Sequence, residues 1–105
     1  MKSILHKIDG TIEVFDDRTL AEAQAERIEL LREMTTQHID QTCPQSTQQN
    51  AALGIYEPAR CEAIKNYIAA CRNEYLRCKA LILAATSNDE ADSVQFIAPS
   101  VPENL

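Results

Sequence analysis

The clearest pattern along the chain is a ladder of apolar positions, separated alternately by three and four residues, in the second half of the sequence. Its eight members are Cys61, Ile64, Ile68, Cys71, Tyr75, Cys78, Ile82 and Ala85. This spacing keeps side chains on one face of an α-helix, and its regular alternation is typical of a helix that packs lengthwise against another helix. The sequence therefore predicts a long helix over residues 57–86, with these eight side chains in a helix–helix seam. Four further apolar residues widen the stripe, so more than one neighbour is expected: Tyr67, Leu76, Leu81 and Leu83.

A second long helix is predicted over residues 17–43, where apolar residues also recur at three- and four-residue steps. These positions are Leu20, Ala23, Ile28, Leu31, Met34 and Ile39. Asp16 or Asp17 can cap the first turn of this helix. Pro44 ends it, because a proline excludes the residue before it from helical geometry.

A connector over residues 44–56 joins the two predicted helices. It contains a short helical turn that Gly54 can close, since glycine readily adopts the left-handed conformation found at helix ends. Pro58 suits the first position of the following helix. The two long helices are therefore expected to form an antiparallel helical hairpin.

Residues 1–16 are predicted to form an N-terminal β-hairpin. Asp9-Gly10 lies between two stretches rich in β-branched and apolar residues, and this dipeptide favours a two-residue type I′ turn. Such a turn pairs Ile8 with Thr11. Because an isolated two-stranded hairpin is only marginally stable, we expect the helices or a partner to cover at least one of its sides.

Residues 87–105 are predicted to hold a short helix and an extended tail. Ser87 and Glu90 have the spacing of a capping box, which marks the start of a helix. Residues 94–97 are compatible with a short C-terminal strand, and the prolines that follow keep the end of the chain extended, either mobile or bound to a partner. The expected fold is thus a single α+β, mainly α, domain over residues 1–105.

Composition and charge narrow the classes of function. With 105 residues the chain has room for one domain with a thin core, so oligomer formation would add buried surface. The formal net charge is −6 and the sequence has no cluster of Lys and Arg, so nucleic acid is not an expected partner. No apolar run approaches membrane-spanning length, and the N-terminus lacks the apolar run of a signal peptide. We therefore expect no membrane partner, and a location in a cytoplasm or in a particle assembled there.

The four cysteines, Cys43, Cys61, Cys71 and Cys78, are predicted to be buried free thiols that pack as small apolar residues. Cys71 and Cys78 are about 10 Å apart on one predicted helix, which is too far for a disulfide. A bridge from Cys43 to another cysteine stays open. The spacings match no zinc pattern, so no metal site and no cofactor are predicted.

No catalytic residue is predicted. A Cys–His nucleophile pair is conceivable if Cys71 or Cys78 approaches His38 within the helical hairpin. A reactive thiolate, however, needs exposure and positive surroundings, which an apolar seam does not provide. The paired acidic residues at 16–17 and 89–90 are explained by helix capping, and two glycines are too few for a phosphate-binding loop.

Six apolar or aromatic residues are candidate contacts with a partner protein. They are Ile4, Ile8, Phe15, Tyr56, Tyr67 and Phe96. Tyrosine is enriched at binding hot spots, although packing in the core is the other interpretation of the tyrosines.

A series of turn and packing motifs runs through the middle of the chain. It consists of Thr42-Cys43-Pro44, Gln48-Gln49-Asn50-Ala51-Ala52-Leu53-Gly54-Ile55-Tyr56, Arg60-Cys61-Glu62-Ala63-Ile64-Lys65, Cys71-Arg72 and Ala84-Ala85-Thr86. Over about residues 18–98, these motifs make the chain resemble small proteins of tailed bacteriophages and prophages that are encoded near tail-fibre genes. The resemblance implies a tail component or a tail-fibre assembly factor, and it implies no catalytic residue.

Together, the residues and this resemblance predict a non-enzymatic structural or assembly protein of a bacteriophage tail. It is expected in the virion, or in the host cytoplasm during assembly, as a homo- or hetero-oligomer whose partner is a tail-fibre or baseplate protein. The alternative is a small acidic regulatory or chaperone-like module, which binds another protein and is absent from the mature particle.

Overall fold

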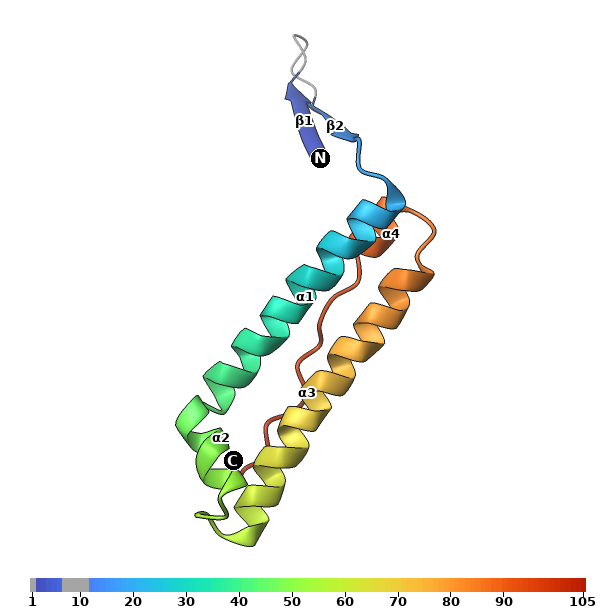
Figure 1. The fold of residues 1–105 in the computed structure, drawn as a ribbon. Coiled ribbons are helices and arrows are strands. Elements are labelled where there is room, and N and C mark those ends of the chain that lie inside the picture. Colours follow the sequence, from blue (N-terminus) through green and yellow to red (C-terminus); the bar gives the residue numbers. More distant parts are fainter. Residues whose placement is uncertain (1, 7–11) are drawn as a thin grey trace.

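The computed structural model describes the backbone of residues 2–6 and 12–105 and the side chains of residues 16–105. Two long helices, α1 (Leu20–Thr42) and α3 (Pro58–Ala84), run antiparallel and side by side (Figure 1). The predicted antiparallel helical hairpin is therefore found, and Pro58 occupies the first turn of α3, where its missing N–H costs no hydrogen bond.

The start of α1 differs from the expectation. Thr19, and neither Asp16 nor Asp17, caps the helix: its Oγ1 accepts a hydrogen bond from the Glu22 amide at 3.1 Å. Asp16 is held instead by the Arg18 guanidinium at 2.7 Å. Asp16 therefore does not cap α1, because its carboxylate is bound in an ion pair, which the capping rules do not consider.

The connector contains a full short helix, α2 (Gln45–Ala52). α1 ends before it because Cys43, which precedes a proline, takes an extended conformation with φ −126° and ψ 85°. α2 is terminated by Gly54, which follows the C-cap Leu53 and has φ +71°, and the Ile55 amide donates to the Asn50 carbonyl at 3.0 Å. This pairing across a left-handed residue is a Schellman motif, and it confirms the role predicted for Gly54.

A last short helix, α4 (Asn88–Asp92), begins where the sequence predicts it. The Ser87 side chain caps it by accepting a hydrogen bond from the Glu90 amide at 3.1 Å. The Glu90 carboxylate does not return to Ser87; it accepts hydrogen bonds from the amide and hydroxyl of Thr86, at 3.2 and 2.8 Å. Ser87 and Glu90 therefore both take part in the cap, as predicted, but Glu90 accepts its hydrogen bonds from Thr86 instead of from the Ser87 amide.

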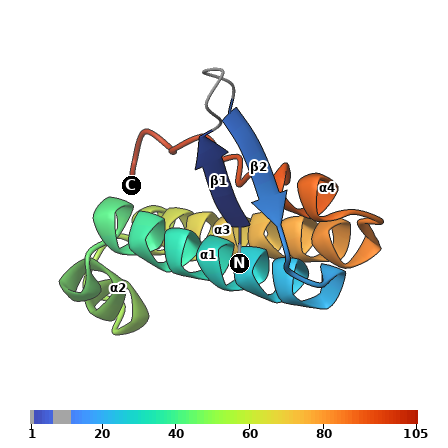
Figure 2. The ribbon, with the colours of Figure 1, turned by 90° about the horizontal axis from the view of Figure 1, so that it is seen from above.

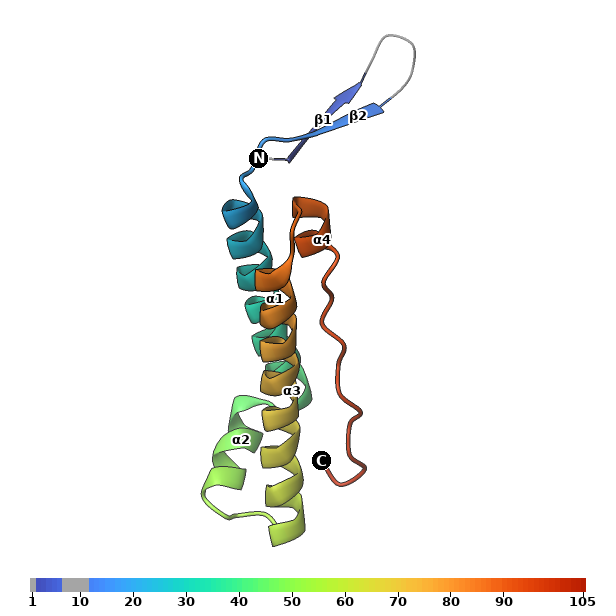
Figure 3. The ribbon, with the colours of Figure 1, turned by 90° about the vertical axis from the view of Figure 1, so that its right-hand side faces the viewer.

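Residues 94–105 form an irregular segment, here called the C-terminal strap. It runs back along the α1/α3 pair on one side, whereas α2 lies on the opposite side (Figures 2 and 3). Helix side chains bind its backbone: Arg27 donates to the Val94 carbonyl at 2.6 and 2.9 Å, and Glu74 accepts from the Ile97 amide at 2.8 Å. The predicted C-terminal strand is therefore wrong, because these backbone groups bond to helix side chains instead of to another strand. The tail, expected to be mobile or partner-bound, is packed on the protein itself.

The predicted α+β class is wrong, and an N-terminal β-hairpin is not part of this fold. Helices make up 70% of residues 16–105 and no strand occurs from residue 17 onward, so the fold is mainly α. Two short extended segments, β1 (Lys2–His6) and β2 (Ile12–Asp16), pair with each other beyond one end of the helices and add no layer to them (Figure 1). Alternating apolar residues predicted the extended conformation, but they do not show whether a sheet packs on the core.

The pairing within these two segments also differs from the prediction. Ile4 lies opposite Val14, one residue away from the register that a two-residue turn at Asp9-Gly10 requires. The predicted turn itself, and the pairing of Ile8 with Thr11, fall outside the described residues.

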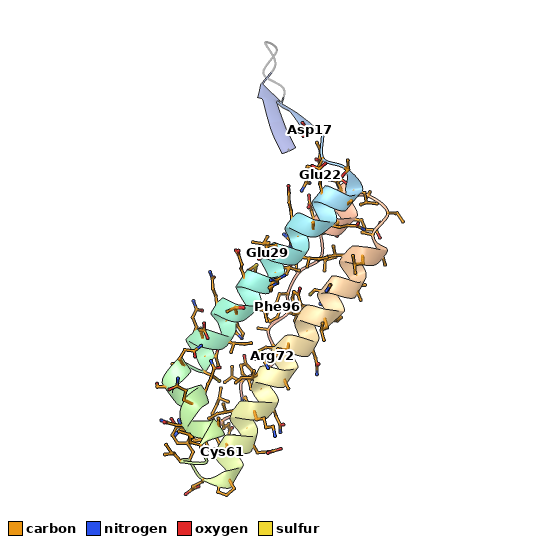
Figure 4. The ribbon with its side chains drawn as sticks, viewed as in Figure 1. Asp17, Glu22, Glu29, Cys61, Arg72 and Phe96 are labelled. Carbon is orange, nitrogen blue, oxygen red and sulfur yellow. The ribbon has the colours of Figure 1, made fainter. Side chains whose placement is uncertain are left out.

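The core consists of two clusters in line along the helices. One contains Leu31, Cys78, Ile82, Ala85 and Ala91, and the other Ile39, Cys43, Ile64, Tyr67 and Cys71. Phe96 of the strap packs against both clusters and lies between α1 and α3 (Figure 4). The strap is therefore a third packing element that joins the two halves of a thin core. Among the described helices, none has the length and apolar character needed to cross a membrane.

Glu74 anchors the strap, and we expect it to make stability depend on pH in the acid range. Hydrogen bonds from Arg77, and after them from the Ile97 amide, hold the pKa of Glu74 down to about 2, from a usual value of 4.5. Because the pKa is lower in the folded state, the carboxylate stabilises that state fully above about pH 4.5, and this contribution is lost as the pH falls toward 2. Urea denaturation of the wild type and of Glu74→Gln should therefore show a weaker acid dependence in the variant. The exposed Glu62→Gln is the control, and identical curves for the two variants would refute the anchoring role.

Candidate interaction surface

The α1/α3 pair is a two-helix layer with unlike faces. The strap covers one face, and α2 covers only one end of the other, next to the turn into α3 (Figure 3). Beyond α2, no described segment lies on this second face, which we call the open face.

A groove of about 730 Å³ lies on the open face between α2 and α3. Its floor is apolar and includes Ala51 of α2 and Ile64 and Ile68 of α3. Its rim carries three exposed charged side chains, the bases Lys65 and Arg72 and the acid Glu62. An apolar centre with a charged rim is the usual make-up of a protein–protein binding site.

A second groove, of about 300 Å³, continues on this face between α1 and α3. Thr35 and Ile39 line it from α1, and Tyr75 lines it from α3. Gln48 and Arg72 line both grooves, so the two are neighbours. The hollow region thus extends from α2 to the middle of the long helices.

Six exposed residues of α3 form a second ladder, with steps of four and three residues. They are Lys65, Ala69, Arg72, Leu76, Lys79 and Leu83, and we call them the basic–apolar stripe. Leu76 and Leu83 are 55% and 58% exposed, although both belong to the interior type of residue. None of the three bases forms an ion pair with a described residue, whereas Arg18, Arg32 and Arg77 all do. Exposed leucines between unpaired bases are a surface that an acidic partner protein can cover.

The eight residues of the predicted seam are placed inward or at the edge of the open face. Five are buried: Ile64, Cys71, Cys78, Ile82 and Ala85. Three are half-buried, and each lines one of the two grooves: Cys61, Ile68 and Tyr75. The seam therefore has one side in the core and one side in contact with the grooves.

Three of the six candidate partner contacts have described side chains: Tyr56, Tyr67 and Phe96. The side chains of Ile4, Ile8 and Phe15 fall outside the described residues. Tyr56 and Phe96 are half-buried and pack against the core clusters, so the chain itself covers much of each ring.

The sixth candidate, Tyr67, is only 2% exposed and is not available to a partner in this structure. Its hydroxyl lies 2.7 Å from Nε2 of His38 and 3.4 Å from the carbonyl oxygen of Pro99 in the strap. Burial raises the pKa of Tyr67, so the hydroxyl stays protonated and serves as a hydrogen-bond donor. His38 is thus engaged by a tyrosine, and the Cys–His pair considered from the sequence is not formed.

The four cysteines are free thiols, and they fall into two classes. Cys43, Cys71 and Cys78 are fully buried, and burial raises the pKa of each thiol. Cys61 is half-buried and lines the larger groove, with its Sγ 3.4 Å from a backbone carbonyl. Only Cys61 is therefore open to reagents from solvent.

We expect Cys61 to be alkylated by iodoacetamide at least about 100-fold faster than the other three cysteines in the folded protein, because the others must wait for unfolding. Mass spectrometry of peptides after timed labelling measures each site separately. In urea the four rates should become similar, which serves as the control. Fast native labelling of Cys71 or Cys78 would show that the α3 seam does not face the core.

At the α4 end, Arg18 joins three acidic side chains, at 2.7 Å from Asp16, 2.7 Å from Asp92 and 2.9 Å from Glu26. The Arg18 side chain is 6% exposed, and it holds the pKa of Asp16 well below its usual range. Carboxylate oxygens of Asp16, Asp89 and Asp92 lie within 4.8 Å of one another, a grouping that could hold a cation. Arg18 already supplies positive charge to two of them, so this cluster ties the start of α1 to α4.

Sequence reasoning missed the basic residues of the interaction surface. From the sequence, Leu76 and Leu83 were expected only to widen the apolar stripe. The absence of a basic surface was inferred from the acidic net charge of the whole chain. The second ladder, with steps of four and three residues from Lys65 onward, is visible in the sequence and could have predicted this surface.

Comparison of the chain with protein-family models, with curated proteins and with solved structures finds no match in any of the three.

Proposed function

We propose that this chain is a non-enzymatic structural or assembly protein of a bacteriophage tail, which binds a neighbouring tail subunit in the groove of its open face. The observation that carries the binding role is the groove of about 730 Å³ between α2 and α3, with an apolar floor and a charged rim that no described segment covers. The tail setting rests on the resemblance over about residues 18–98. In that setting the partner is a tail-fibre or baseplate protein, and the location is the virion or the host cytoplasm during assembly.

The rest of the fold supports a scaffold role. Arg27, Glu74 and Arg77 pin the strap to the face opposite the groove, so the strap braces α1 against α3. A binding surface built on braced helices is presented with little loss of conformational entropy on association.

The test is mass spectrometry of purified tail particles from the phage or lysogen that encodes the chain. We expect the chain in these particles at a fixed ratio to the other tail proteins. Substitution of the groove floor by Ile68→Glu should remove it from the particles while the protein still folds, and Ile97→Glu, the same change at an exposed residue of the strap, is the matched control. Particles without the wild-type chain would contradict a structural role.

The alternative, an acidic chaperone-like module, is favoured by one observation: the outer side of α1 carries Glu22, Glu29 and Glu33, all exposed. Such a module would co-purify with unassembled fibre protein and be missing from finished particles. The same particle analysis therefore separates the two functions.

A further inference from the structure

The second groove of the open face, between α1 and α3, indicates what kind of segment binds there. We propose that an acidic amphipathic helix of the neighbouring subunit lies lengthwise in this groove, with its apolar side on the groove floor and its carboxylates toward the bases on both walls. The inference deepens the proposed function and rests on it, because it names the part of the neighbouring subunit that the open face binds.

Both walls of this groove carry exposed basic side chains. Arg32 lines it from α1 and Arg72 lines it from α3, and Lys79 follows Arg72 two turns along α3. Arg72 and Lys79 form no ion pair with a described residue. Arg32 is paired with Glu29 at 3.3 Å, but both groups are more than half exposed. Such a pair contributes little stability, so Arg32 can exchange Glu29 for a carboxylate of a partner.

Most of the acidic residues lie away from this groove, so it attracts negative charge although the chain has a net charge of −6. One acid lines the groove, Asp40, and the side-chain amides of Gln45 and Gln48 donate to it at 3.2 and 3.3 Å. Glu22 and Glu29 lie on the side of α1 that is turned away from α3 (Figure 4). Because salt screens exposed charges beyond about 10 Å, the local bases and not the net charge decide what binds here.

The strap shows, by contrast, why a helix fits this groove better than an extended segment. On the strap face, Arg27 donates to a strap carbonyl and Glu74 accepts from a strap amide, so helix side chains serve both kinds of backbone group. The second groove offers bases, but its one carboxylate is already bound by amides of α2. An extended segment would leave its N–H groups without a protein acceptor there, whereas a helix satisfies its backbone internally.

The floor of the groove and the neighbouring α2 also favour a helix. The floor consists of two buried side chains and one half-buried side chain, Thr35, Ile39 and Tyr75. α2 already packs as a helix on the same face, through Ala51 (Figure 3). Beyond it the uncovered part of α3 continues from Arg72 to Ala84, or about 18 Å, which three turns of a partner helix would cover. Helices that pack lengthwise match side chains at steps of three and four residues, the spacing that α3 presents.

Fluorescence anisotropy of a labelled synthetic peptide, added to the full chain, tests the proposal. The probe is a hydrocarbon-stapled helix of about 14 residues, because a shorter unstapled helix is marginally stable in water. It carries leucines at steps of three and four residues and glutamates on both flanks, and its control has glutamine in place of every glutamate. We expect the glutamate peptide to bind at least about fivefold more tightly, with a difference that shrinks as salt increases. The net charge of the chain alone predicts the opposite order.

Two double variants that change the net charge by the same amount locate the site. Arg72→Gln/Lys79→Gln should weaken binding of the glutamate peptide at least about fivefold and leave binding of the glutamine peptide unchanged. Asn66→Glu/Ala80→Glu is the control, since both residues are exposed on α3 and neither lines a groove. Its effect should stay below about twofold. Circular dichroism confirms that both variants keep their helices.

The proposal is overturned if the glutamate peptide does not bind at concentrations up to about 1 mM. It is also overturned if the two peptides bind alike, or if the two double variants weaken binding to the same extent. A DNA duplex that displaces the peptide and binds at least as tightly would likewise overturn it, because the bases would then bind a polyanion without any contribution from the apolar floor.

Analysis of tail particles separates this inference from the proposed function. Arg72→Gln/Lys79→Gln should lower the amount of the chain in particles, whereas Asn66→Glu/Ala80→Glu should not. Absence of the wild-type chain from particles would refute the proposed function and leave the peptide binding standing. A chain that is present in particles but fails to bind the glutamate peptide would refute only the helix in the second groove.

Discussion

Ile82→Ala should lower the free energy of unfolding by about 3 kcal/mol. Ile82 is fully buried in the upper core cluster, where Leu31 of α1, Cys78 of α3 and Ala91 of α4 surround it. Removing its outer carbons leaves a cavity that three separate elements cannot all move to fill. In a thin core this loss is a large share of the total stability, which for a domain of this size is about 5–10 kcal/mol.

The matched control is Leu83→Ala, one residue along the same helix. Leu83 is 58% exposed, so this change should alter the unfolding free energy by less than about 0.5 kcal/mol. Urea denaturation at a concentration where the chain is monomeric measures both variants. Equal losses at the two positions would mean that α3 is rotated about its axis, so that Ile82 does not face the core.

Phe96→Ala should be nearly as costly, at about 2–3 kcal/mol, even though Phe96 lies in an irregular segment. Its ring packs against both core clusters and sits 5.8 Å, centre to centre, from the His38 ring. Losing it uncouples the strap from the helices and exposes the apolar surface that the strap covers. The value is below that for a fully buried phenylalanine because the side chain is half-buried.

Ile97→Ala is the control for this prediction. Ile97 is adjacent in sequence, but its side chain is 68% exposed, and its amide contact with Glu74 does not depend on the side chain. Its effect should therefore stay below about 0.5 kcal/mol. If Phe96→Ala is as mild as Ile97→Ala, the strap does not contribute to the core.

The helices were predictable because their signals are local and redundant. Each of these signals depends on a few neighbouring residues, and each is found in the structure. They are the apolar ladder of α3, the proline that excludes Cys43 from helical geometry, the glycine at position 54 that terminates α2, and the cap at Ser87. The error at the start of α1 is of another kind. Arg18 binds the carboxylate of Asp16 in an ion pair, which the capping rules do not consider, and Thr19 caps the helix by accepting a hydrogen bond from the Glu22 amide.

The strap and the fold class could not be derived from periodicity. Residues 94–105 have no regular pattern, and the strap is held by hydrogen bonds from Arg27 and Arg77 to backbone carbonyls, which leave no sequence signature. The alternation of apolar residues in the N-terminal segment led to the wrong prediction of a β-hairpin in the domain, because it does not indicate what would pack on such a hairpin. A sheet becomes part of a domain only when another layer covers it.

The candidate surface was predictable in part. The sequence indicated that the apolar stripe on α3 was too wide for one neighbour, and the structure divides it between the core, the strap face and the open face. Which side the strap would take was not predictable, and that choice decides which side chains remain uncovered. Tyr67 illustrates this, because it is buried under the strap, whereas Leu76 on the other side of the helix is exposed.

The most direct test is hydrogen exchange at the Ile97 amide, measured by NMR, because the open face exists only if the strap covers the opposite face of the helical layer. The amide donates to the Glu74 carboxylate at 2.8 Å, so its exchange should be slowed at least about tenfold relative to an unstructured chain, and Glu74→Gln should reduce that protection. Exchange at the rate of a free peptide would mean that residues 94–105 are detached, and that the two faces of the helical layer are alike.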